Sequence, residues 1–360
     1  MDLESVRHAV EAIPVPRLRR TLGGLGLITG LDQGAGGAVR VAVALPEGIV
    51  AEADLGTAVA AAARSAGAAG ADLAVEPMDG AAQEALAARL TAGRPPRPGG
   101  AGSRTRVLAV ASGKGGVGKS SVAANTAVAL ARAGHDTAVL DADVWGFSIP
   151  RMLGVQEEPV VVGGLIVPAV GHGVRVISMD FFVPPDEAVI WRGPMLHKAL
   201  EQFLDEVFWD EPEFLLLDLP PGTGDVPISL SQFVPGALAV VVTTPQPTAQ
   251  RVARRAALMS AKMEQEVAGV VENMSWFTGD DGRRYEIFGA GGGLSLAAEL
   301  GVPLLGRVPL VPALREGADR GVPAALAAPG SEAEAAFEAI AAALAGLRPR
   351  VRRRRELSVQ

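Results

Sequence analysis

The sequence predicts an α/β protein: a mostly parallel sheet flanked by helices, preceded by a small α/β N-terminal domain. Three observations support this. Short, nearly continuous apolar runs ending in polar residues recur after residue 105, as expected of parallel strands buried on both faces. A glycine-rich stretch joins the first run to a segment with helical apolar spacing. A stretch rich in Pro, Gly and Arg separates this region from a smaller one.

Composition narrows the class of protein. The 360 residues are 49% hydrophobic and carry a net charge of -7, which fits a globular chain long enough for two domains and does not call for a nucleic acid partner. The start has no basic region, and no apolar run approaches the roughly 18 residues of a membrane helix. We therefore expect a cytoplasmic protein with no membrane partner. The chain has 0 cysteines, which excludes disulfides, thiolate metal sites and thiol nucleophiles.

Composition also divides the chain. Residues 91–105, TAGRPPRPGGAGSRT, have no apolar periodicity and are predicted to be a solvated linker. We expect a small α/β domain at 1–90 and a large domain at 106–347. Residues 348–360 form an Arg-rich tail that is predicted to be disordered.

In the small domain, the pattern predicts helices at 3–13 and about 50–66, and strands around 26–30 and at 39–45 and 71–78. No catalytic constellation appears there, so alone it would be a structural or partner-binding module.

In the large domain, the pattern predicts strands within 106–112, 136–144, 213–222, 237–245, 267–275 and 301–310. A helix at 121–134 ends at Gly134, a candidate C′ glycine. A helix at 331–347 opens with a capping-box pattern, Ser331 to Glu334. Ligands of such sheets bind at the carboxyl ends of the strands.

The stretch ASGKGGVGKS contains a phosphate-binding loop, Gly-x-x-x-x-Gly-Lys-Ser, from Gly113 to Ser120. Its glycines let backbone N–H groups face a phosphate chain without interference from a Cβ. Lys119 would neutralise the β- and γ-phosphates, and the Ser120 hydroxyl would coordinate Mg²⁺. A glycine-rich turn without a ligand is disfavoured, because a strand precedes the loop and a helix follows it. The sequence therefore predicts a P-loop NTPase.

Three aspartates end neighbouring apolar runs. Asp218, in FLLLD, is placed as a Walker B carboxylate that holds Mg²⁺ through water; the alternative is a helix cap. Asp141 and Asp143 end LDAD, where one carboxylate could polarise the attacking water and another could help hold Mg²⁺; the alternative is a solvated turn.

A second lysine, Lys114, follows Gly113 directly. An added cation at the transition state of phosphoryl transfer is worth roughly 10³ to 10⁵ in rate and is often supplied by a neighbouring chain. Lys114 is therefore either a solvated surface charge or a group that serves the nucleotide of a second copy.

The motif KGGVGKS resembles the deviant Walker A motif of the signature-lysine ATPases, in which this lysine contacts nucleotide across a face-to-face dimer. Seven further stretches resemble Mrp-type iron-sulfur cluster carrier ATPases over about 106–323. They are DADVWGFSIPRMLG, WRGPMLHKAL, LLLDLPPGTGD, VVTTPQP, ENMSWF, IFGAGGG and LGVPLLGRVPLVPALREGAD. The small domain resembles the one that precedes the ATPase in many bacterial members.

The resemblance implies a homodimer that hydrolyses Mg-ATP and acts in iron-sulfur cluster assembly or transfer, with apo iron-sulfur proteins or assembly factors as partners. ATP, Mg²⁺ and an iron-sulfur cluster would be the cofactors. Lys114, Lys119 and Asp143 would serve catalysis, with Asp143 as the switch I carboxylate. The metal residues would be Ser120 and Asp218, together with Asp141, which is assigned from its position in LDAD. The phosphate-binding residues would be Gly113, Lys114, Gly115, Gly116, Val117, Gly118, Lys119, Ser120 and Ser121.

The resemblance also assigns the rest of the nucleotide site. Gly222 and Asp225, in PPGTGD, would be the switch II residues that sense the γ-phosphate. Asn273 would read adenine, with Pro309 and Val311 beside the base. An asparagine amide offers both a donor and an acceptor to the base edge; the alternative is a turn residue.

One departure bears on the cluster. Family members commonly place a Cys-x-x-Cys pair where this chain has Thr278, Gly279, Asp280 and Asp281. Carboxylates are hard ligands, whereas iron-sulfur clusters are held by thiolates or occasionally imidazole, and the four histidines show no paired spacing. A cluster-free, nucleotide-gated adaptor is therefore a second hypothesis. A third, a partition or positioning ATPase, would want an amphipathic C-terminal helix, and the Arg-rich tail has no apolar face.

Overall fold

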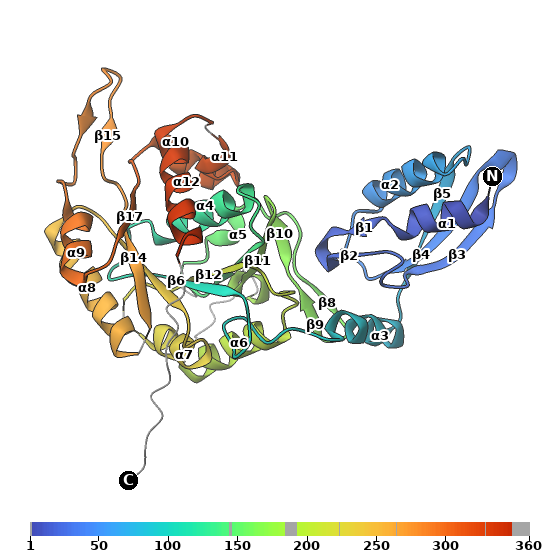
Figure 1. The fold of residues 1–360 in the computed structure, drawn as a ribbon, viewed down its shortest axis with the longest axis horizontal. Helices are drawn as coiled ribbons and strands as arrows, with labels where there is room; N and C mark the ends of the chain where they lie inside the picture. The colour runs from blue at the N-terminus through green and yellow to red at the C-terminus, as the bar shows by residue number, and fades with distance from the viewer. Residues whose placement is uncertain are drawn as a thin grey trace, which may run out of the picture.

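The computed structural model describes residues 2–143, 146–183, 193–222, 224–263, 265–327 and 329–347, except for the side chain of Asp225. The central element is an eight-stranded sheet in the order β10-β11-β7-β12-β6-β13-β14-β17 (Figure 1). Its strands are β6 (Arg106–Ser112), β7 (Thr137–Asp141), β10 (Ala169–Gly171), β11 (Val174–Ser178), β12 (Phe214–Asp218), β13 (Leu238–Thr243), β14 (Glu266–Glu272) and β17 (Leu304–Arg307). All neighbours are parallel except β10 and β11, which confirms the predicted architecture.

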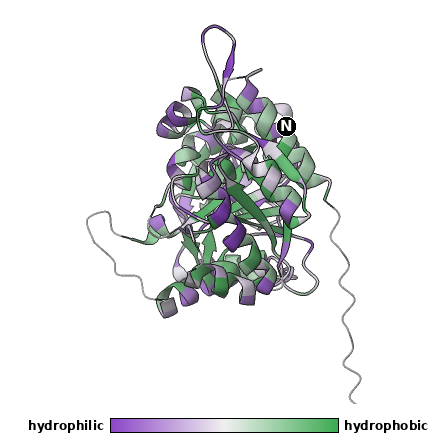
Figure 2. Ribbon diagram, turned by 90° about the vertical axis from the view of Figure 1, so that its left-hand side faces the viewer, coloured by the Kyte–Doolittle hydropathy of each residue, from purple (hydrophilic) through white to green (hydrophobic). Residues whose placement is uncertain are grey.

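Helices cover both faces of this sheet, and Figure 2 shows its apolar strands between them. They are α4 (Lys119–Arg132), α5 (Ile149–Met152), α6 (Gly193–Glu206), α7 (Asp225–Phe233), α8 (Pro247–Lys262), α9 (Gly292–Leu300), α10 (Pro312–Arg320), α11 (Ala324–Ala327) and α12 (Glu332–Ala345), with a 3-10 turn, η3 (Met179–Phe182). Alternate residues of β6 enter different cores. Leu108 and Val110 pack with α4 and α12, whereas Val107 and Ala109 pack with α6 and α7. Burial on both faces explains why the strands read as continuous apolar runs.

The predicted helix ends are found, with one difference. Gly134 follows α4 with a φ of 89°, the left-handed conformation expected of a C′ glycine. The Ser331 hydroxyl accepts a hydrogen bond from the Glu334 N–H at 3.1 Å, which caps α12. The Glu334 carboxylate instead binds Arg132 and the N–H of Gly330. Only half of the predicted capping box is therefore formed.

The N-terminal region forms its own three-stranded sheet. Its elements are α1 (Leu3–Glu11), β1 (Pro14–Val15), η1 (Pro16–Leu18), β2 (Arg20–Thr21), β3 (Ile28–Gln33), η2 (Ala35–Gly37), β4 (Val39–Leu45), α2 (Glu52–Ser65), β5 (Ala71–Pro77) and α3 (Gly80–Thr91). β4 pairs antiparallel with β3 and parallel with β5. The predicted helices and strands are present, and α3 is an additional helix that the sequence pattern did not indicate.

The core of this N-terminal region extends into the large domain. A hairpin of β8 (Val160–Val162) and β9 (Leu165–Val167) supplies Val162, Leu165 and Val167 to the same hydrophobic cluster, and Phe208 joins them. In Figure 1 the hairpin lies where the two lobes meet. The small domain is thus fixed to the hairpin by a shared apolar core.

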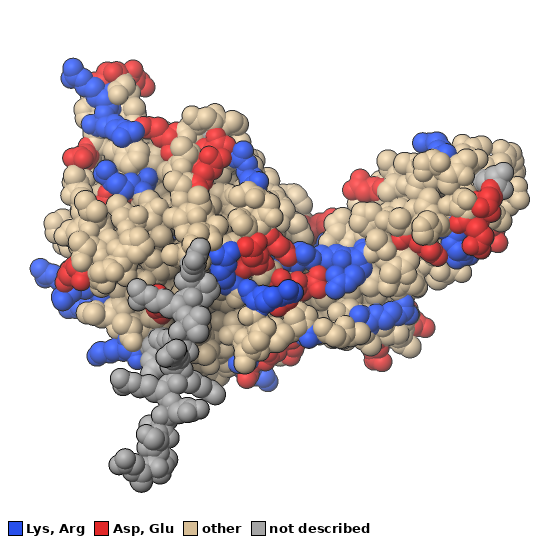
Figure 3. Space-filling model, in the orientation of Figure 1, with Lys and Arg blue, Asp and Glu red and all other residues tan. Residues whose placement is uncertain are grey.

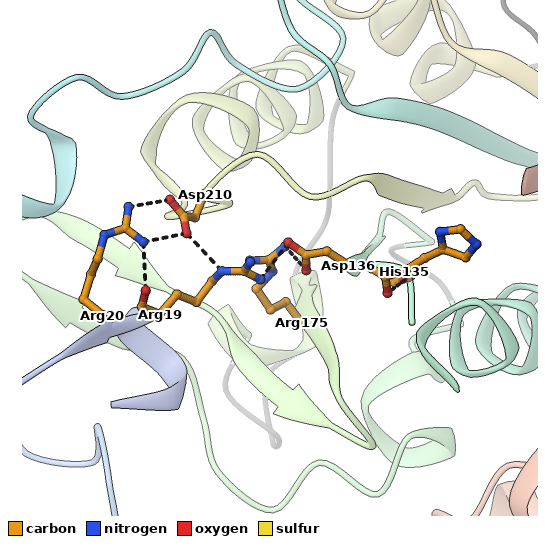
Figure 4. Close-up of polar contacts among 7 residues, drawn as sticks. Arg19, Arg20, His135, Asp136, Arg175 and Asp210 are labelled. Carbon is orange, nitrogen blue, oxygen red and sulfur yellow. Dashed lines mark hydrogen bonds and ion pairs between the residues drawn. The ribbon is translucent and has the colours of Figure 1, made fainter. Parts of the chain in front are cut away.

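Charged residues also gather at this junction, as the adjacent blue and red atoms in Figure 3 show. Asp210 lies 3.0 Å from both Arg19 and Arg20, and Asp136 lies 2.7 Å from Arg19 and 2.8 Å from Arg175. Figure 4 shows the two carboxylates alternating with the guanidinium groups. Through Asp210, these pairs connect β2 and the turn before it to the segment that precedes β12. Through Asp136, they connect the same turn to the residue before β7 and to β11.

Residues 91–105 are less solvated than the sequence suggests. Pro98 is buried, and the Arg94 guanidinium donates to the Val207 carbonyl at 2.6 Å. Arg97 donates to the Phe233 carbonyl at 3.3 Å and lies over its ring. Two of the linker arginines therefore bind main-chain carbonyls of the large domain.

Replacing Arg17 with alanine is expected to loosen the junction. Arg17 is only 7% exposed and donates to the carbonyls of Gly48, Glu158, Val167 and Pro168. Buried acceptors left without a donor cost about 1–3 kcal/mol each when water cannot reach them. We expect Arg17→Ala to lower the free energy of unfolding by roughly 2–4 kcal/mol in urea titrations. Arg40→Ala, at an exposed strand position, is the control; equal stability of the two variants would contradict this role.

Candidate functional site

The phosphate loop connects β6 to α4, as the sequence predicts, at the carboxyl edge of the sheet. Gly116 and Gly118 have φ values of 78° and 80°, which favour glycine. Gly113 is required for a different reason, because a Cβ there would collide with the backbone of Val252 in α8. The loop borders a cavity of about 210 Å³, lined by Ser112, Lys114, Gly115, Gly116, Val117, Gly118, Lys119, Ser120, Ser121, Asp143, Ser148, Met152 and Pro221.

Lys119 lies at the first turn of α4 and is 6% exposed. Its ammonium group donates to Asp218 Oδ1 at 2.6 Å and lies 3.6 Å from Asp143 Oδ2. The Ser120 hydroxyl is 3.3 Å away. The structure thus brings together the lysine, the serine and two of the three predicted carboxylates. A phosphate chain in the cavity would meet this cation at the helix N-terminus.

Asp218 ends β12 opposite Asp141, which ends β7. Asp218 is fully buried, and its Oδ2 has no hydrogen-bond partner among the residues that the structure describes. Burial raises the pKa of the Asp218 carboxyl, while the nearby Lys119 opposes that shift. A buried oxygen without a partner, beside the Ser120 hydroxyl, fits a hard cation such as Mg²⁺.

Asp141 is also fully buried, but both its oxygens already accept hydrogen bonds. They come from the N–H groups of Asp143, Ser148 and Ile149 and from the Ser178 hydroxyl, at 3.2–3.3 Å. Burial, and then the charge of Asp218, raises the pKa of Asp141. The side chain therefore holds the start of α5 and the turn containing Asp143. Its direct ligation of Mg²⁺ stays a prediction, and the contacts favour a positioning role.

Lys114 does not bind the carboxylates around Lys119. Its ammonium lies 3.4 Å from the Gln246 side-chain oxygen, at the start of α8, and its carbonyl accepts from the Ser112 hydroxyl at 3.1 Å. Sequence reasoning did not single out Gln246, although it lies within the VVTTPQP motif. Within one chain, therefore, the Lys114 side chain is held by Gln246 and not by a carboxylate.

The predicted switch II residues follow β12. The Gly222 N–H donates to the Ser112 carbonyl at 2.9 Å, which holds this turn against the end of β6. Asp225 begins α7; its side chain lies outside the described residues. The predicted switch II segment therefore lies next to the phosphate loop, as a segment that senses the γ-phosphate must.

The predicted adenine residues come from two segments that hydrogen bonds join. Ser275 N–H donates to the Val308 carbonyl at 2.9 Å, and Leu310 N–H donates to the Trp276 carbonyl at 2.7 Å. Asn273, at the end of β14, is thereby brought near the segment with Pro309 and Val311. Asn273 is 4% exposed, and its amide donates to the Val117 carbonyl of the phosphate loop at 2.8 Å.

The place of the expected cysteine pair is an exposed hairpin of β15 (Phe277–Thr278) and β16 (Arg284–Tyr285), which projects from the molecule in Figure 1. The Asp281 carboxylate accepts from the Tyr285 hydroxyl and the Arg283 N–H, and Thr278 donates to Glu332 at 2.7 Å. Among the described residues, no three His, Asp or Glu side chains cluster so as to hold a metal ion. The Asp281 carboxylate thus stabilises the turn of the hairpin, and the Thr278 hydroxyl binds Glu332 at its base.

No helix in the described part of the chain has the length and apolarity that crossing a membrane requires.

Comparison with known proteins gives consistent matches. A protein-family model described as NUBPL iron-transfer P-loop NTPase matches residues 103–345. An iron-sulfur cluster carrier protein of Mycobacterium tuberculosis is 43% identical over 341 residues, covering 91% of this chain and 89% of that protein. One from Synechocystis is 48% identical over 252 residues, covering 68% and 71%.

Solved structures agree on the fold. A nucleotide-binding protein from Archaeoglobus fulgidus in complex with ADP has a TM-score of 0.54 and 34% identity, covering 61% of this chain and 88% of that one. A septum site-determining protein, MinD, from Pyrococcus horikoshii complexed with Mg-ADP has a TM-score of 0.52 and 24% identity, covering 67% and 98%.

Proposed function

The chain belongs to the family of NUBPL-type iron-transfer P-loop NTPases, and we therefore propose that it binds and hydrolyses Mg-ATP as a homodimer. We further propose that this ATPase cycle serves iron-sulfur cluster assembly or transfer to apoproteins. The observation that carries the nucleotide chemistry is Lys119, buried between Asp218 and Asp143 at the phosphate cavity.

In the proposed reaction, a water oxygen bonds to the γ-phosphorus while the bond from that phosphorus to the bridging oxygen breaks, releasing ADP and inorganic phosphate. Lys119 and the loop N–H groups bind the phosphate oxygens. Asp143 lines the cavity and is the carboxylate that would accept a hydrogen bond from the water. Ser120 and Asp218 would hold Mg²⁺, which neutralises charge on the β- and γ-oxygens when bound.

The homodimer is proposed from Lys114. Lys119 already supplies the cation that pairs with the carboxylates at the chain's own cavity, whereas Lys114 lines the same cavity with its ammonium 3.4 Å from the Gln246 side-chain oxygen. Because the carboxylates at the cavity pair with Lys119 and not with Lys114, we assign the Lys114 ammonium to a second copy's nucleotide, as the signature-lysine motif implies. ATP would hold two copies together, and loss of the γ-phosphate would release switch II and loosen the pair.

The second candidate is a nucleotide-gated adaptor that carries no cluster and binds its partners through the small domain or the switch surface. The hairpin at residues 277–285 favours it. Thr278 and Asp281 stand where the cysteine pair is expected; the Thr278 hydroxyl donates to Glu332, and the Asp281 carboxylate accepts from the Tyr285 hydroxyl. The two candidates share the ATPase cycle. In the first the cycle serves iron-sulfur cluster assembly or transfer, and in the second it controls the binding of partners.

Iron analysis tests whether the chain itself carries a cluster, which the adaptor does not. After anaerobic incubation with ferrous iron and sulfide, we expect the full chain to retain well below one iron per protomer, with or without Mg-ATP, because it has no thiolates. The measurement is iron and acid-labile sulfide after desalting. The double variant Thr278→Cys with Asp281→Cys is the matched control, since it adds only a Cys-x-x-Cys pair. Stoichiometric iron and sulfide on the cysteine-free chain would refute the adaptor and the ligand argument together.

A further inference from the structure

Asn273 touches the phosphate loop as well as the expected base site. Its side-chain amide donates to the Val117 carbonyl at 2.8 Å. The two residues are 156 positions apart in the sequence, so this bond exists only because β14 ends beside the loop. A Cβ on Gly118 would collide with the same amide, which shows how closely Asn273 approaches the loop.

Asn273 is itself firmly held. Its N–H donates to the Thr243 carbonyl at 2.8 Å, at the end of β13. The preceding residue, Glu272, is fully buried and accepts from Arg307 and Ser275, each at 2.9 Å, and from the Gly293 N–H. Buried groups with several partners move little, because every displacement leaves a donor or acceptor unpaired. Asn273 is therefore a fixed support.

The bond sets the direction of a loop N–H group. A trans peptide is planar, so its carbonyl and its N–H point in opposite directions. With the Val117 carbonyl held on Asn273, the Gly118 N–H points away from Asn273, and Gly118 lines the phosphate cavity. Loop N–H groups that already face the cavity bind phosphate without first having to reorganise.

We propose that Asn273 is a positioning residue for the phosphate loop, so that its side chain controls affinity for the phosphate chain whatever base is attached. This inference rests on the proposed nucleotide function of the same site. The Asn273 amide would then have two separate effects. Holding the Val117 carbonyl would affect the binding of any triphosphate, whereas contact with the base would affect only nucleotides.

The test compares ligands with and without a base. Affinities of the full chain for Mg-ATP, Mg-GTP and Mg-tripolyphosphate are measured by displacement of a fluorescent ATP analogue. We expect Asn273→Ala to weaken tripolyphosphate binding about tenfold, the change that loss of one buried hydrogen bond produces. ATP and GTP should weaken by at least that factor. Asn273→Leu, which has a similar size and lacks the N–H donor without adding a charge, should behave similarly and serves if the alanine variant does not fold.

Asn125→Ala is the matched control. Asn125 is 5% exposed and bridges the Ser121 carbonyl and the Ala325 N–H, without a bond to residues 113–118. It should lower the melting temperature and leave tripolyphosphate affinity within about twofold, as expected of a purely structural asparagine.

Two results would overturn the proposal. Tripolyphosphate affinity that is unchanged in folded Asn273 variants, whether or not ATP weakens, would mean that the amide does not brace the loop. A wild-type chain that binds neither ATP nor tripolyphosphate would remove the proposed nucleotide function and this inference with it. The first result leaves the ATPase proposal intact, so the two failures are distinguishable.

Discussion

Lys114→Ala is expected to retain ATP binding within about threefold while its turnover falls by roughly 10³-fold, the lower range for a transition-state cation. Binding is expected to survive because Lys119, and not Lys114, pairs with the carboxylates of the chain's own site. Lys114 makes no ion pair with the carboxylates at the phosphate cavity, where Lys119 lies 2.6 Å from Asp218. The measurements are phosphate release at saturating Mg-ATP and molar mass by light scattering with a non-hydrolysable analogue. Nucleotide-dependent dimers should be lost together with turnover.

A mixing experiment shows whether Lys114 acts on the other copy. Lys114→Ala keeps Asp143, and Asp143→Asn keeps Lys114, so each variant alone should be inactive. A mixed dimer has one site with an intact Asp143 and a lysine from its partner. Mixing should therefore restore measurable turnover, up to about a quarter of the wild-type rate if dimers form at random and each site works independently. Wild-type turnover by Lys114→Ala alone, or no recovery in a mixture in which mixed dimers have formed, would rule out the action across a dimer.

Lys119→Ala is expected to weaken ATP binding itself by about 100-fold, because charge-assisted hydrogen bonds to phosphate are worth roughly 1.5–3 kcal/mol each. The variant also leaves Asp218 and Asp143 without the cation that now lies 2.6 and 3.6 Å from them. Two uncompensated carboxylates would repel the triphosphate. Isothermal titration with Mg-ATP measures the effect.

Lys262→Ala is the control for this prediction, since it removes an exposed lysine at the end of α8. It should bind ATP with wild-type affinity. If Lys119→Ala bound ATP as tightly as this control, Lys119 would have no part in holding the phosphates.

Local sequence patterns predicted those parts of the nucleotide site that are formed by a single continuous segment of the chain. The strand, loop and helix at 106–132 were predictable because apolar runs, glycines and helical spacing lie side by side in the chain. Asp218 and Asp143 could be placed at one edge because parallel strands end together. The small domain's strands were predictable for the same local reasons, whereas α3 has little apolar patterning and was not indicated.

The roles of Asp141 and Asn273 could not be predicted in this way. As sequence, Asp141 and Asp143 look alike, two residues apart in LDAD. The fold makes one fully buried, with four protein donors, and places the other at the cavity. Gln246, the partner of Lys114, lies 132 positions away, and no local pattern pairs the two.

Residue types and motifs predicted the family, the parallel α/β architecture, the phosphate loop and the absence of thiolates before any fold was known. These depend on residue types and on spacings within single segments, which are visible without a fold. The folded chain was needed to show which aspartate faces the cavity and that Asn273 reaches the loop. It was also needed to show that Arg17 and the hairpin at 160–167 join the N-terminal region to the rest of the chain. Each of these depends on burial and on hydrogen bonds between distant segments, and those arise only when the sheet brings the strand ends and loops together.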